Sequence, residues 1–350
     1  MWQRMLMEEA GAMALAIEQA ASVRSRTSPN PWVGAVLLDA NGHVVGLGAT
    51  EPAGGAHAEV IAITGAGAAA VGATLVVTLE PCSHHGRTPP CVDAIVAAGV
   101  ARVVVGVYDP DRRVAGRGVA ALLAAGLSVE VGLLADLVTA QLEPYLHHRR
   151  TGRPYVVCKL ATTLDGGIAA PDGSSQWITG QEARTDVHRL RAESDAIIVG
   201  AGTIRADDPS LTVRHLEGTN PLRVVLGRAP ADARVHPCLE WRGDIRALLD
   251  ELGRRGIVQV MIEGGSAVVR SFHDDDLIDR YVIYIAPALL TGRDMVPLLA
   301  GPTASSIDAM WRGHFVDVRC LGDDLRLVLI PHSRSAMATV HSSSDDDTGF

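Results

Sequence analysis

Two short segments near the start of the chain constrain its fold more than any other feature. The first is His57-Ala58-Glu59, and the second begins at Pro81-Cys82 and ends, after eight intervening residues, at Cys91. One histidine and two cysteines supply three of the four ligands of a tetrahedral zinc ion and leave the fourth position open for water. Glu59 is placed to move protons to and from that water. The fold must therefore bring these two segments together.

The same residues have a plainer interpretation, in which the histidine and the cysteines are core residues and Glu59 is a solvated helix residue. Each residue taken alone favours it. The combination, with a proline directly before the first cysteine, favours catalytic zinc and is typical of zinc deaminases, which replace an amino group on a nucleobase-like ring. His84 and His85 lie between the cysteines. We expect them to pack in the loop or contact substrate, because a fourth protein ligand would close the open position.

The bulk properties exclude several classes of protein. A chain of 350 residues predicts two domains at about 150 residues each. The net charge of −9 argues against a large nucleic-acid surface, which needs clustered cations. We expect no membrane span, since no apolar run reaches about 20 residues, and no signal peptide, since three glutamates lie among the first 20 residues. Five scattered cysteines suggest reduced thiols in a cytoplasmic protein, and we also expect a homo-oligomer.

The first 150 residues alternate strand and helix patterns, which predicts a mainly parallel sheet with helices on both faces. The helix that starts near Ala135 should end or kink before Pro144. We expect strands over 34–39, 43–47, 74–79, 102–107 and 127–131, and further helices over 5–21, from 57, over 90–98 and over 119–125. The first two strands are expected to form a hairpin with its turn at Asn41-Gly42.

A polar segment with a glycine and a proline, 147–154, separates a second α/β series from the first. The expected domains are therefore 1–150 and 151–331. The remaining residues, 332–350, are rich in Ser and Asp and should be disordered. The second series is expected to have strands over 155–160, 196–199, 222–226, 259–262, 280–285 and 325–330, with a helix over 181–193.

The eight residues between the cysteines, SHHGRTPP, make the chain recognisable. Their number and sequence resemble the bifunctional riboflavin-biosynthesis enzymes, in which a diaminohydroxyphosphoribosylaminopyrimidine deaminase is fused to a 5-amino-6-(5-phosphoribosylamino)uracil reductase. The segment PNPWVGAV at 29–36 fits the family without a substitution, and Asp109-Pro110-Asp111 followed by VAGRG also resembles it. The resemblance implies a cytidine-deaminase-like three-layer domain followed by a dihydrofolate-reductase-like α/β domain. It implies Zn²⁺ and NADPH as cofactors.

By this resemblance, five residues contact the pyrimidine and the ribose phosphate of the deaminase substrate. Without it, they would be taken for turn, cap and surface residues. The family usually has Asn in place of Asp111, and an added negative charge near a phosphorylated ligand is unfavourable unless it is screened or protonated. The five residues are Asn30, Arg87, Thr88, Asp109 and Asp111.

The second half is harder to interpret by itself. No G-x-G-x-x-G follows its first strand, so an ordinary dinucleotide site is not supported. Glu263-Gly264-Gly265-Ser266 follows an apolar run, and such a turn can present backbone N–H groups to a phosphate. A plain tight turn explains the same residues equally well.

The resemblance makes the second half more specific. It implies catalytic roles for Lys159 and Asp207, as polarising and orienting groups, beside Glu59 in the first half. The implied NADPH contacts are Ala161, Trp177, Thr203, Asp207, Gly265, Ser266 and Ser271. The implied substrate contacts are Lys159, Ser175, Arg191, Leu211, Arg214 and Glu263.

The chain departs from the family pattern in its second half. Gly167 stands where the family has Arg or Lys, and Gly227-Arg228 stands where a cofactor-side serine is usual. The segment 237–241 is expected to be a splice across a missing strand.

Two functional hypotheses follow. In the first, the chain deaminates 2,5-diamino-6-ribosylamino-4(3H)-pyrimidinone 5′-phosphate and then reduces the ribosyl group to ribityl with NADPH. In the alternative, the deaminase is functional and the second domain is degenerate or acts on a related pyrimidine. The acidic charge opposes a nucleic-acid deaminase, and a structural zinc site would require a fourth protein ligand.

Overall fold

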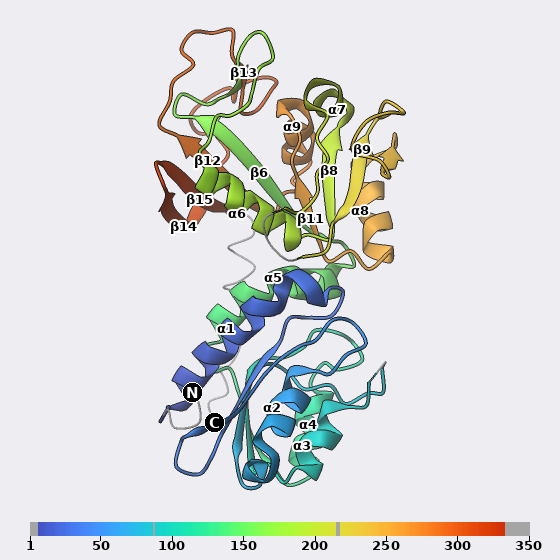
Figure 1. Ribbon diagram of the computed structural model, residues 1–350, viewed down its shortest axis with the longest axis vertical. Coiled ribbons are helices and arrows are strands. Elements are labelled where there is room, and N and C mark those ends of the chain that lie inside the picture. The colour runs from blue at the N-terminus through green and yellow to red at the C-terminus, as the bar shows by residue number, and fades with distance from the viewer. Residues whose placement is uncertain (1–5, 87, 215–217, 333–350) are drawn as a thin grey trace, which may run out of the picture. The chain divides into compact units, whose positions relative to one another are not determined.

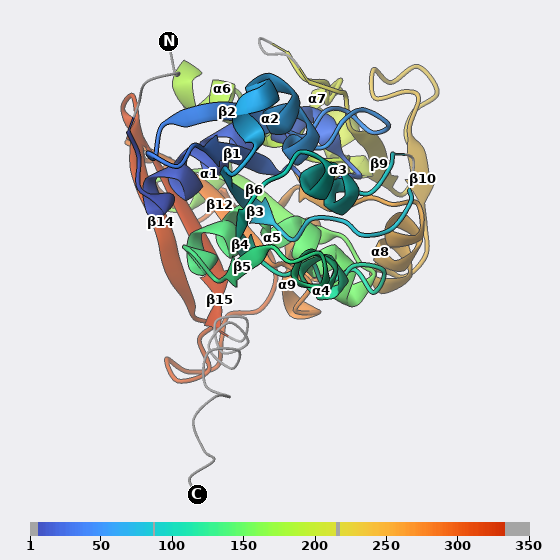
Figure 2. The same cartoon turned by 90° about the horizontal axis from the view of Figure 1, so that it is seen from below.

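A computed structural model describes residues 6–86, 88–214 and 218–332 (Figure 1, and Figure 2 from below). Almost all of the tail that was expected to be disordered, 333–350, therefore lies outside the described residues. The chain separates into two compact units, one formed by 1–154 with 252–258 and the other by 155–251 with 259–350. Each unit has its own sheet.

The first unit contains a five-stranded sheet of order β2-β1-β3-β4-β5. Its strands are β1 (Gly34–Leu38), β2 (Val44–Ala49), β3 (Thr74–Leu79), β4 (Arg102–Val107) and β5 (Ser128–Val131). Its helices are α1 (Glu9–Thr27), α2 (Ala58–Ala66), the 3₁₀ turn η1 (Gly67–Ala70), α3 (Cys91–Ala97), α4 (Arg117–Ala124) and α5 (Ala135–Thr151). Helix α1 begins later than expected and runs six residues past the predicted end at 21.

The sheet of the first unit is mixed. The hairpin expected at Asn41-Gly42 is confirmed as the antiparallel pair β1 and β2, whereas the antiparallel pairing of β1 with β3 was not expected. Strand β1 runs antiparallel to both β2 and β3, whereas β3, β4 and β5 are parallel to one another. The reversal comes from the tight turn at Asn41-Gly42, in which Gly42 has a φ of 81°. A glycine adopts this left-handed conformation without steric cost.

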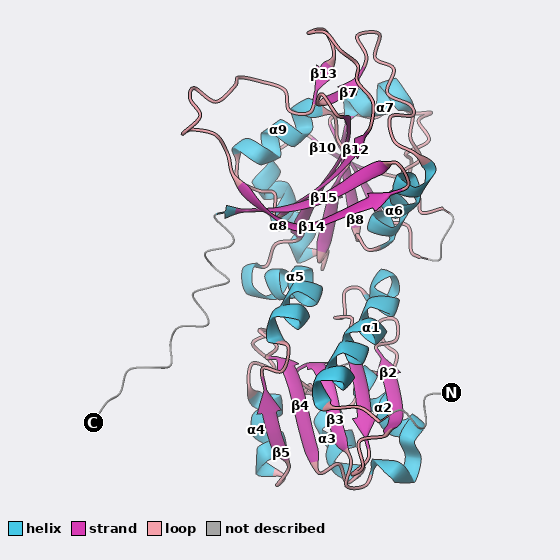
Figure 3. Ribbon diagram, turned by 90° about the vertical axis from the view of Figure 1, so that its left-hand side faces the viewer, coloured by secondary structure: helices cyan, strands magenta, loops and turns pink. Residues whose placement is uncertain are grey.

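Helices α1 and α2 lie directly on opposite faces of this sheet (Figure 3). A Cβ atom at Gly34 would lie 1.8 Å from the carbonyl oxygen of Ala16 in α1, and one at Gly48 would lie 2.0 Å from that of Ala58 in α2. Because Gly48 pairs with Ala35, the neighbour of Gly34, the two glycines face opposite sides. The close contact fixes the start of α2 against the sheet, which is where His57 and Glu59 lie.

Helix α5 does not end before Pro144, contrary to expectation. It continues to Thr151 with Pro144 in its interior. An interior proline costs about 3 kcal/mol. The next two side chains, Tyr145 and Leu146, are 3% and 1% exposed, and burying such side chains stabilises by about 1.5–3 kcal/mol each. The uninterrupted helix places Tyr145 and Arg149 one turn apart on the same face.

The second unit contains an eight-stranded sheet of order β10-β9-β8-β11-β6-β12-β15-β14. Its strands, with the pair β7 and β13, are β6 (Tyr155–Thr163), β7 (Gly167–Ala169), β8 (Ala196–Gly200), β9 (Leu222–Leu226), β10 (Leu239–Trp241), β11 (Gln259–Ile262), β12 (Arg280–Ala286), β13 (Val296–Pro297), β14 (Gly313–Leu321) and β15 (Asp324–Pro331). Its helices are α6 (Gln181–Ala192), α7 (Ala201–Asp207), α8 (Ile245–Arg254) and α9 (Ser266–Asp274).

The segment that was expected to splice across a missing strand is itself a strand. Strand β10 pairs in parallel with β9 and forms one edge of the sheet. Strand β14, which the sequence did not predict, forms the other edge and runs antiparallel to β15. Among the described residues, no helix combines the length and the hydropathy that crossing a membrane requires.

Candidate active site

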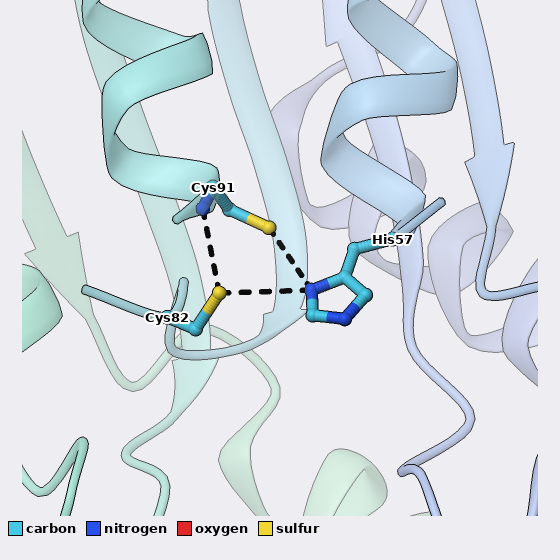
Figure 4. A group of neighbouring side chains, drawn as sticks. All are labelled: His57, Cys82 and Cys91. Atoms are coloured by element: carbon cyan, nitrogen blue, oxygen red, sulfur yellow. Dashed lines mark hydrogen bonds between the residues drawn. The ribbon is translucent and has the colours of Figure 1, made fainter. Parts of the chain in front are cut away.

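The proposed zinc ligands meet at the ends of three elements of the first unit (Figure 4). His57 caps α2, Cys91 is the first residue of α3, and Cys82 lies between β3 and α3. The Nδ1 atom of His57 is 3.2 Å from the Cys91 sulphur and 3.6 Å from the Cys82 sulphur. The three ligand atoms all lie within 4.8 Å of one another. Two thiols and an imidazole at these distances fit a zinc ion with one open position.

One of the two thiols, that of Cys82, is held in its charged form. Hydrogen bonding with Cys91 lowers the pKa of the Cys82 thiol to about 4, against the opposing effect of burial, with further help from His57. The same hydrogen bond and burial raise the pKa of Cys91. The Cys91 backbone N–H donates to the Cys82 sulphur at 3.3 Å. Zinc binding displaces the remaining thiol proton, since only a thiolate coordinates the metal.

The second ring nitrogen of His57 also has a partner. Its Nε2 atom lies 3.4 Å from the Thr88 hydroxyl. Such a contact orients the ring of a metal-binding histidine and selects its tautomer. Thr88 therefore stabilises the orientation in which Nδ1 faces the two sulphurs.

Glu59 lies in the first turn of α2 and is 4% exposed. Burial raises the pKa of its carboxyl group above the ordinary value, although the positive charge of His57 acts in the opposite direction. A carboxyl group whose pKa is raised toward neutrality is suited to accept and return a proton. The raised pKa fits the role of proton carrier.

Four of the five contacts predicted for the deaminase substrate line one cavity of about 390 Å³ together with His57, Glu59 and Cys82. Arg87 lies outside the described residues. The predicted contacts that line this cavity are Asn30, Thr88, Asp109 and Asp111.

Sequence reasoning missed Glu80, which is 3% exposed and lines the same cavity. Its carboxylate accepts hydrogen bonds from the backbone N–H groups of four residues that follow β4, at 2.8–3.2 Å. The four residues are Asp109, Gly116, Gly118 and Val119. Because Glu80 directly precedes Pro81-Cys82, it ties the metal-binding segment to the loop 109–118. A carboxylate before Pro-Cys is visible in the sequence, but its partners are not.

Asp109 is held at the base of this loop and is 5% exposed. It accepts hydrogen bonds from the Tyr145 hydroxyl at 3.0 Å and from the Asp111 N–H at 2.8 Å. Burial raises the pKa of Asp109 despite these bonds. Tyr145 was not predicted from the sequence.

The negative charge of Asp111 is screened by two arginines that the sequence analysis did not select. Arg113 donates to Asp111 through Nε at 3.1 Å and through a terminal nitrogen at 2.8 Å. The Nε atom of Arg149 lies 3.8 Å from the same carboxylate. Hydrogen bonds from Arg113 lower the pKa of Asp111 to about 2, with Arg149 adding to the effect. Asp111 is therefore ionised and paired.

In the second unit, three of the predicted substrate contacts form a charged cluster. Arg191 on α6 donates two hydrogen bonds to Glu263, at 2.6 and 2.7 Å. Glu263 follows β11 and Lys159 lies on the neighbouring strand β6. Burial lowers the pKa of Lys159, although the charge of Glu263 opposes this. His188 on α6 is buried beside the cluster and acts electrostatically on Glu263.

Three of the predicted cofactor contacts, Thr203, Gly265 and Ser266, lie in the helices or turns that follow two neighbouring strands. Gly200 caps α7 after β8, and Gly265 caps α9 after β11, which pairs with β8. A Cβ atom at Gly265 would lie 3.8 Å from the hydroxyl of Thr203. Two helix N-termini beside a glycine turn fit the phosphates of NADPH.

The other predicted contacts of the second unit are more dispersed. A hydrogen bond from Ser175 favours ionised Asp207, although burial outweighs it and raises the pKa of Asp207. Trp177 is 69% exposed with the Arg184 guanidinium 4.8 Å from its ring centre. Three residues complete the set: Ala161 is half-buried on β6, Leu211 is buried, and the backbone N–H of Arg214 donates to His188.

Ser271 lies away from the glycine turn, and Gly167 stands at the position where the family has Arg or Lys. Ser266, the first residue of α9, is buried at the turn, but Ser271 lies five residues along the helix and donates to the Ala267 carbonyl at 3.1 Å. A Cβ atom at Gly167 would lie 2.6 Å from Leu290. A larger residue at 167 would require the side-chain ends of Leu290 and Met295 to shift.

Two family models match the chain. Residues 7–107 match the cytidine and deoxycytidylate deaminase zinc-binding region. Residues 154–325 match the RibD C-terminal domain. Together with the cluster of three zinc ligands and the nearby Glu59, these matches define a zinc-dependent deaminase joined to an NADPH-dependent reductase.

Known proteins resemble the chain over nearly its whole length. It is 46% identical to the riboflavin biosynthesis protein RibD of Mycobacterium tuberculosis, over 91% of this chain and 96% of that one. It is 38% identical to RibD of Escherichia coli, over 93% of this chain and all of that one. The structure of Acinetobacter baumannii RibD is 38% identical, with a TM-score of 0.86 over 92% of this chain and 98% of that one. The chain belongs to the RibD family of bifunctional riboflavin-biosynthesis enzymes.

Proposed function

We propose that the first unit removes an amino group from 2,5-diamino-6-ribosylamino-4(3H)-pyrimidinone 5′-phosphate and that the second reduces the ribosyl group of the product to ribityl. The cavity that is lined by two of the zinc ligands, His57 and Cys82, and by Glu59, Asn30 and Asp109 carries this proposal. A solved Thermotoga maritima protein described as this deaminase and reductase supports it. That protein is 34% identical, with a TM-score of 0.82 over 92% of this chain and 98% of that one.

In the proposed deamination, water enters and ammonia leaves. When bound by His57, Cys82 and Cys91, zinc supplies the Lewis acidity that makes water a nucleophile near neutral pH. Glu59 takes the proton of the attacking water and returns it to the departing amino group. Asn30, Thr88 and Asp109 hold the ring and the sugar in the cavity. Arg87 is proposed as a further contact on the resemblance alone.

In the proposed reduction, two hydrogens are added and the sugar ring opens. NADPH, when bound at the turns before α7 and α9, supplies a hydride. Lys159 polarises the sugar and delivers the accompanying proton, because its lowered pKa favours proton release. Arg191 and Glu263 position Lys159 and the substrate relative to each other, and Asp207 orients the reacting groups.

The experiment that tests the proposal follows both products in one reaction. Purified full-length protein is given the pyrimidine phosphate and NADPH, and ammonia and NADPH are measured together. We expect one ammonia released for each NADPH oxidised. Absence of ammonia release would contradict the deaminase assignment.

A second candidate keeps the deaminase and gives the second unit another specificity. Gly167, which stands where the family has a cation, favours it. This candidate predicts ammonia release without NADPH oxidation. The same assay therefore separates the two candidates.

We further propose that the domains are 1–150 and 151–331 and that the protein works in the cytoplasm as a homo-oligomer. All five cysteines are free, which supports a reducing compartment. Strand β14 forms one edge of its sheet. Three of its apolar side chains are exposed: Phe315 by 61%, Val316 by 52% and Val318 by 58%. An exposed apolar edge strand is suited to pairing with a second copy. Light scattering on wild type and Val318→Asp tests this, since a monomeric wild type would contradict it.

A further inference from the structure

Arg149 occupies a distinctive place in the deaminase cavity. It lies on α5, one turn after Tyr145, and its guanidinium carbon is 5.0 Å from the centre of the Tyr145 ring. Its side chain is 25% exposed, and it lines the same cavity as His57 and Glu59. Stacking on an aromatic ring restricts a guanidinium group to one plane. Arg149 is therefore a cation with a defined orientation in the cavity.

Asp111 fixes this orientation from a second side. Its carboxylate lies 3.8 Å from the Nε atom of Arg149. At this distance the contact is an ion pair and not a hydrogen bond. The planar fork of a guanidinium group matches the oxygens of a phosphate group.

Asp111, Arg113 and Arg149 together carry one negative and two positive charges. Asp109, which lines the same cavity and acts electrostatically on Arg149, is a further carboxyl group beside them, and burial raises its pKa. Arg113 is engaged with Asp111 through its backbone N–H and two side-chain hydrogen bonds. Glu80, a neighbouring carboxylate, is already bonded to four backbone N–H groups. These bonds also hold the loop that carries Asp111, so the arrangement is preorganised.

We propose that Arg149 binds the 5′-phosphate of the deaminase substrate and that Asp111 positions its guanidinium group. This inference rests on the proposed function, which supplies a phosphorylated ribosyl substrate. It explains how the cavity accepts an anion beside Asp111, because the carboxylate acts on the arginines and its own charge is neutralised. Arg149 is the substrate contact, and Asp111 is a positioning residue.

The test compares the phosphorylated substrate with the same compound after phosphatase treatment. Ammonia release by the zinc-loaded full chain gives KM and kcat for each. Arg149→Met should raise KM for the phosphorylated substrate by roughly tenfold or more, the effect of losing one charge-assisted pair. We expect kcat to change less than about twofold and KM for the dephosphorylated compound to stay the same. Arg149→Lys should lie between wild type and Arg149→Met.

The positioning role is tested by a double-mutant cycle. Asp111→Asn should raise KM for the phosphorylated substrate in the wild-type background and have no further effect when combined with Arg149→Met. Arg150→Met is the matched control, because Arg150 is the exposed neighbour of Arg149 and does not line the cavity. It removes the same charge and should leave both KM values unchanged.

Each other outcome overturns a specific statement. An equal rise of KM for both compounds, or no rise for the phosphorylated one, overturns the role of Arg149. An Asp111→Asn effect that persists beside Arg149→Met overturns the positioning role of Asp111. Wild-type protein that releases no ammonia from the phosphorylated substrate overturns the proposed function, and this inference with it.

Discussion

Glu59 is buried two residues past a metal ligand, where a neutral amide can occupy the same space. Glu59→Gln should lower ammonia release by about 10²–10⁴-fold, the usual contribution of a general acid and base. Zinc content, measured by atomic absorption, should stay at the wild-type value because Glu59 does not belong to the ligand set. Turnover at the wild-type rate would remove Glu59 from the mechanism.

The pKa of Glu263 determines how this residue's contribution to the stability of the second unit depends on pH. Burial alone would raise the pKa of Glu263, but the charge and the hydrogen bonds of Arg191 outweigh it and hold the pKa below the ordinary value. The unfolded chain therefore takes up the proton first, and the stabilisation by Glu263 is lost as pH falls.

Glu263→Gln tests this sign. The variant should unfold more easily than wild type above about pH 5, and the difference should shrink toward lower pH as the wild-type carboxylate is protonated. Urea unfolding at several pH values measures it. A difference that grows toward acid would contradict the direction of the pKa shift.

At the scale of elements, the single carboxylate of Glu80 joins β3 to the loop that leads into α4. In Glu80→Gln, one of the two carboxylate oxygens becomes an NH₂ group, which donates hydrogen bonds and does not accept them. The backbone N–H groups that were bonded to that oxygen therefore lose their partner. We expect a loss of about 1–3 kcal/mol in the free energy of unfolding. KM for the deaminase substrate should rise while zinc remains bound.

The matched control is Glu130→Gln. Glu130 forms an exposed salt bridge with Arg102, and its side chain is 51% exposed, so its loss should cost less than about 1 kcal/mol. If the two substitutions lowered the free energy of unfolding equally, the hydrogen bonds of Glu80 to the loop 109–118 would not stabilise the fold.

The pattern of strands was largely predictable because most strands are short apolar runs between turn residues. The bounds 74–79, 102–107, 222–226 and 259–262 agree with β3, β4, β9 and β11. Strand β14 was missed, since its apolar residues are exposed and show no alternation between core and solvent. Helix α5 was misjudged at Pro144 because the burial of Tyr145 and Leu146 depends on the tertiary structure.

At the scale of the whole molecule, the two units have separate sheets and separate candidate sites. A chelator that removes zinc should abolish ammonia release. The oxidation of NADPH with deaminated substrate should keep at least about half its rate, because no residue of the proposed reductase site belongs to the zinc set. Separate assays of the two reactions before and after chelation measure this. Parallel loss of both activities would contradict separate sites.

The sequence by itself determined the metal chemistry and the family. Ligand type and spacing are local properties, so one histidine, two cysteines and the eight residues between them were enough to predict a zinc deaminase of riboflavin synthesis. The tertiary structure decided what surrounds the substrate. Glu80, Tyr145 and Arg149 acquire their roles from partners 29 to 39 residues away in the chain. Such contacts depend on how the sheet and α5 pack, which no local pattern encodes.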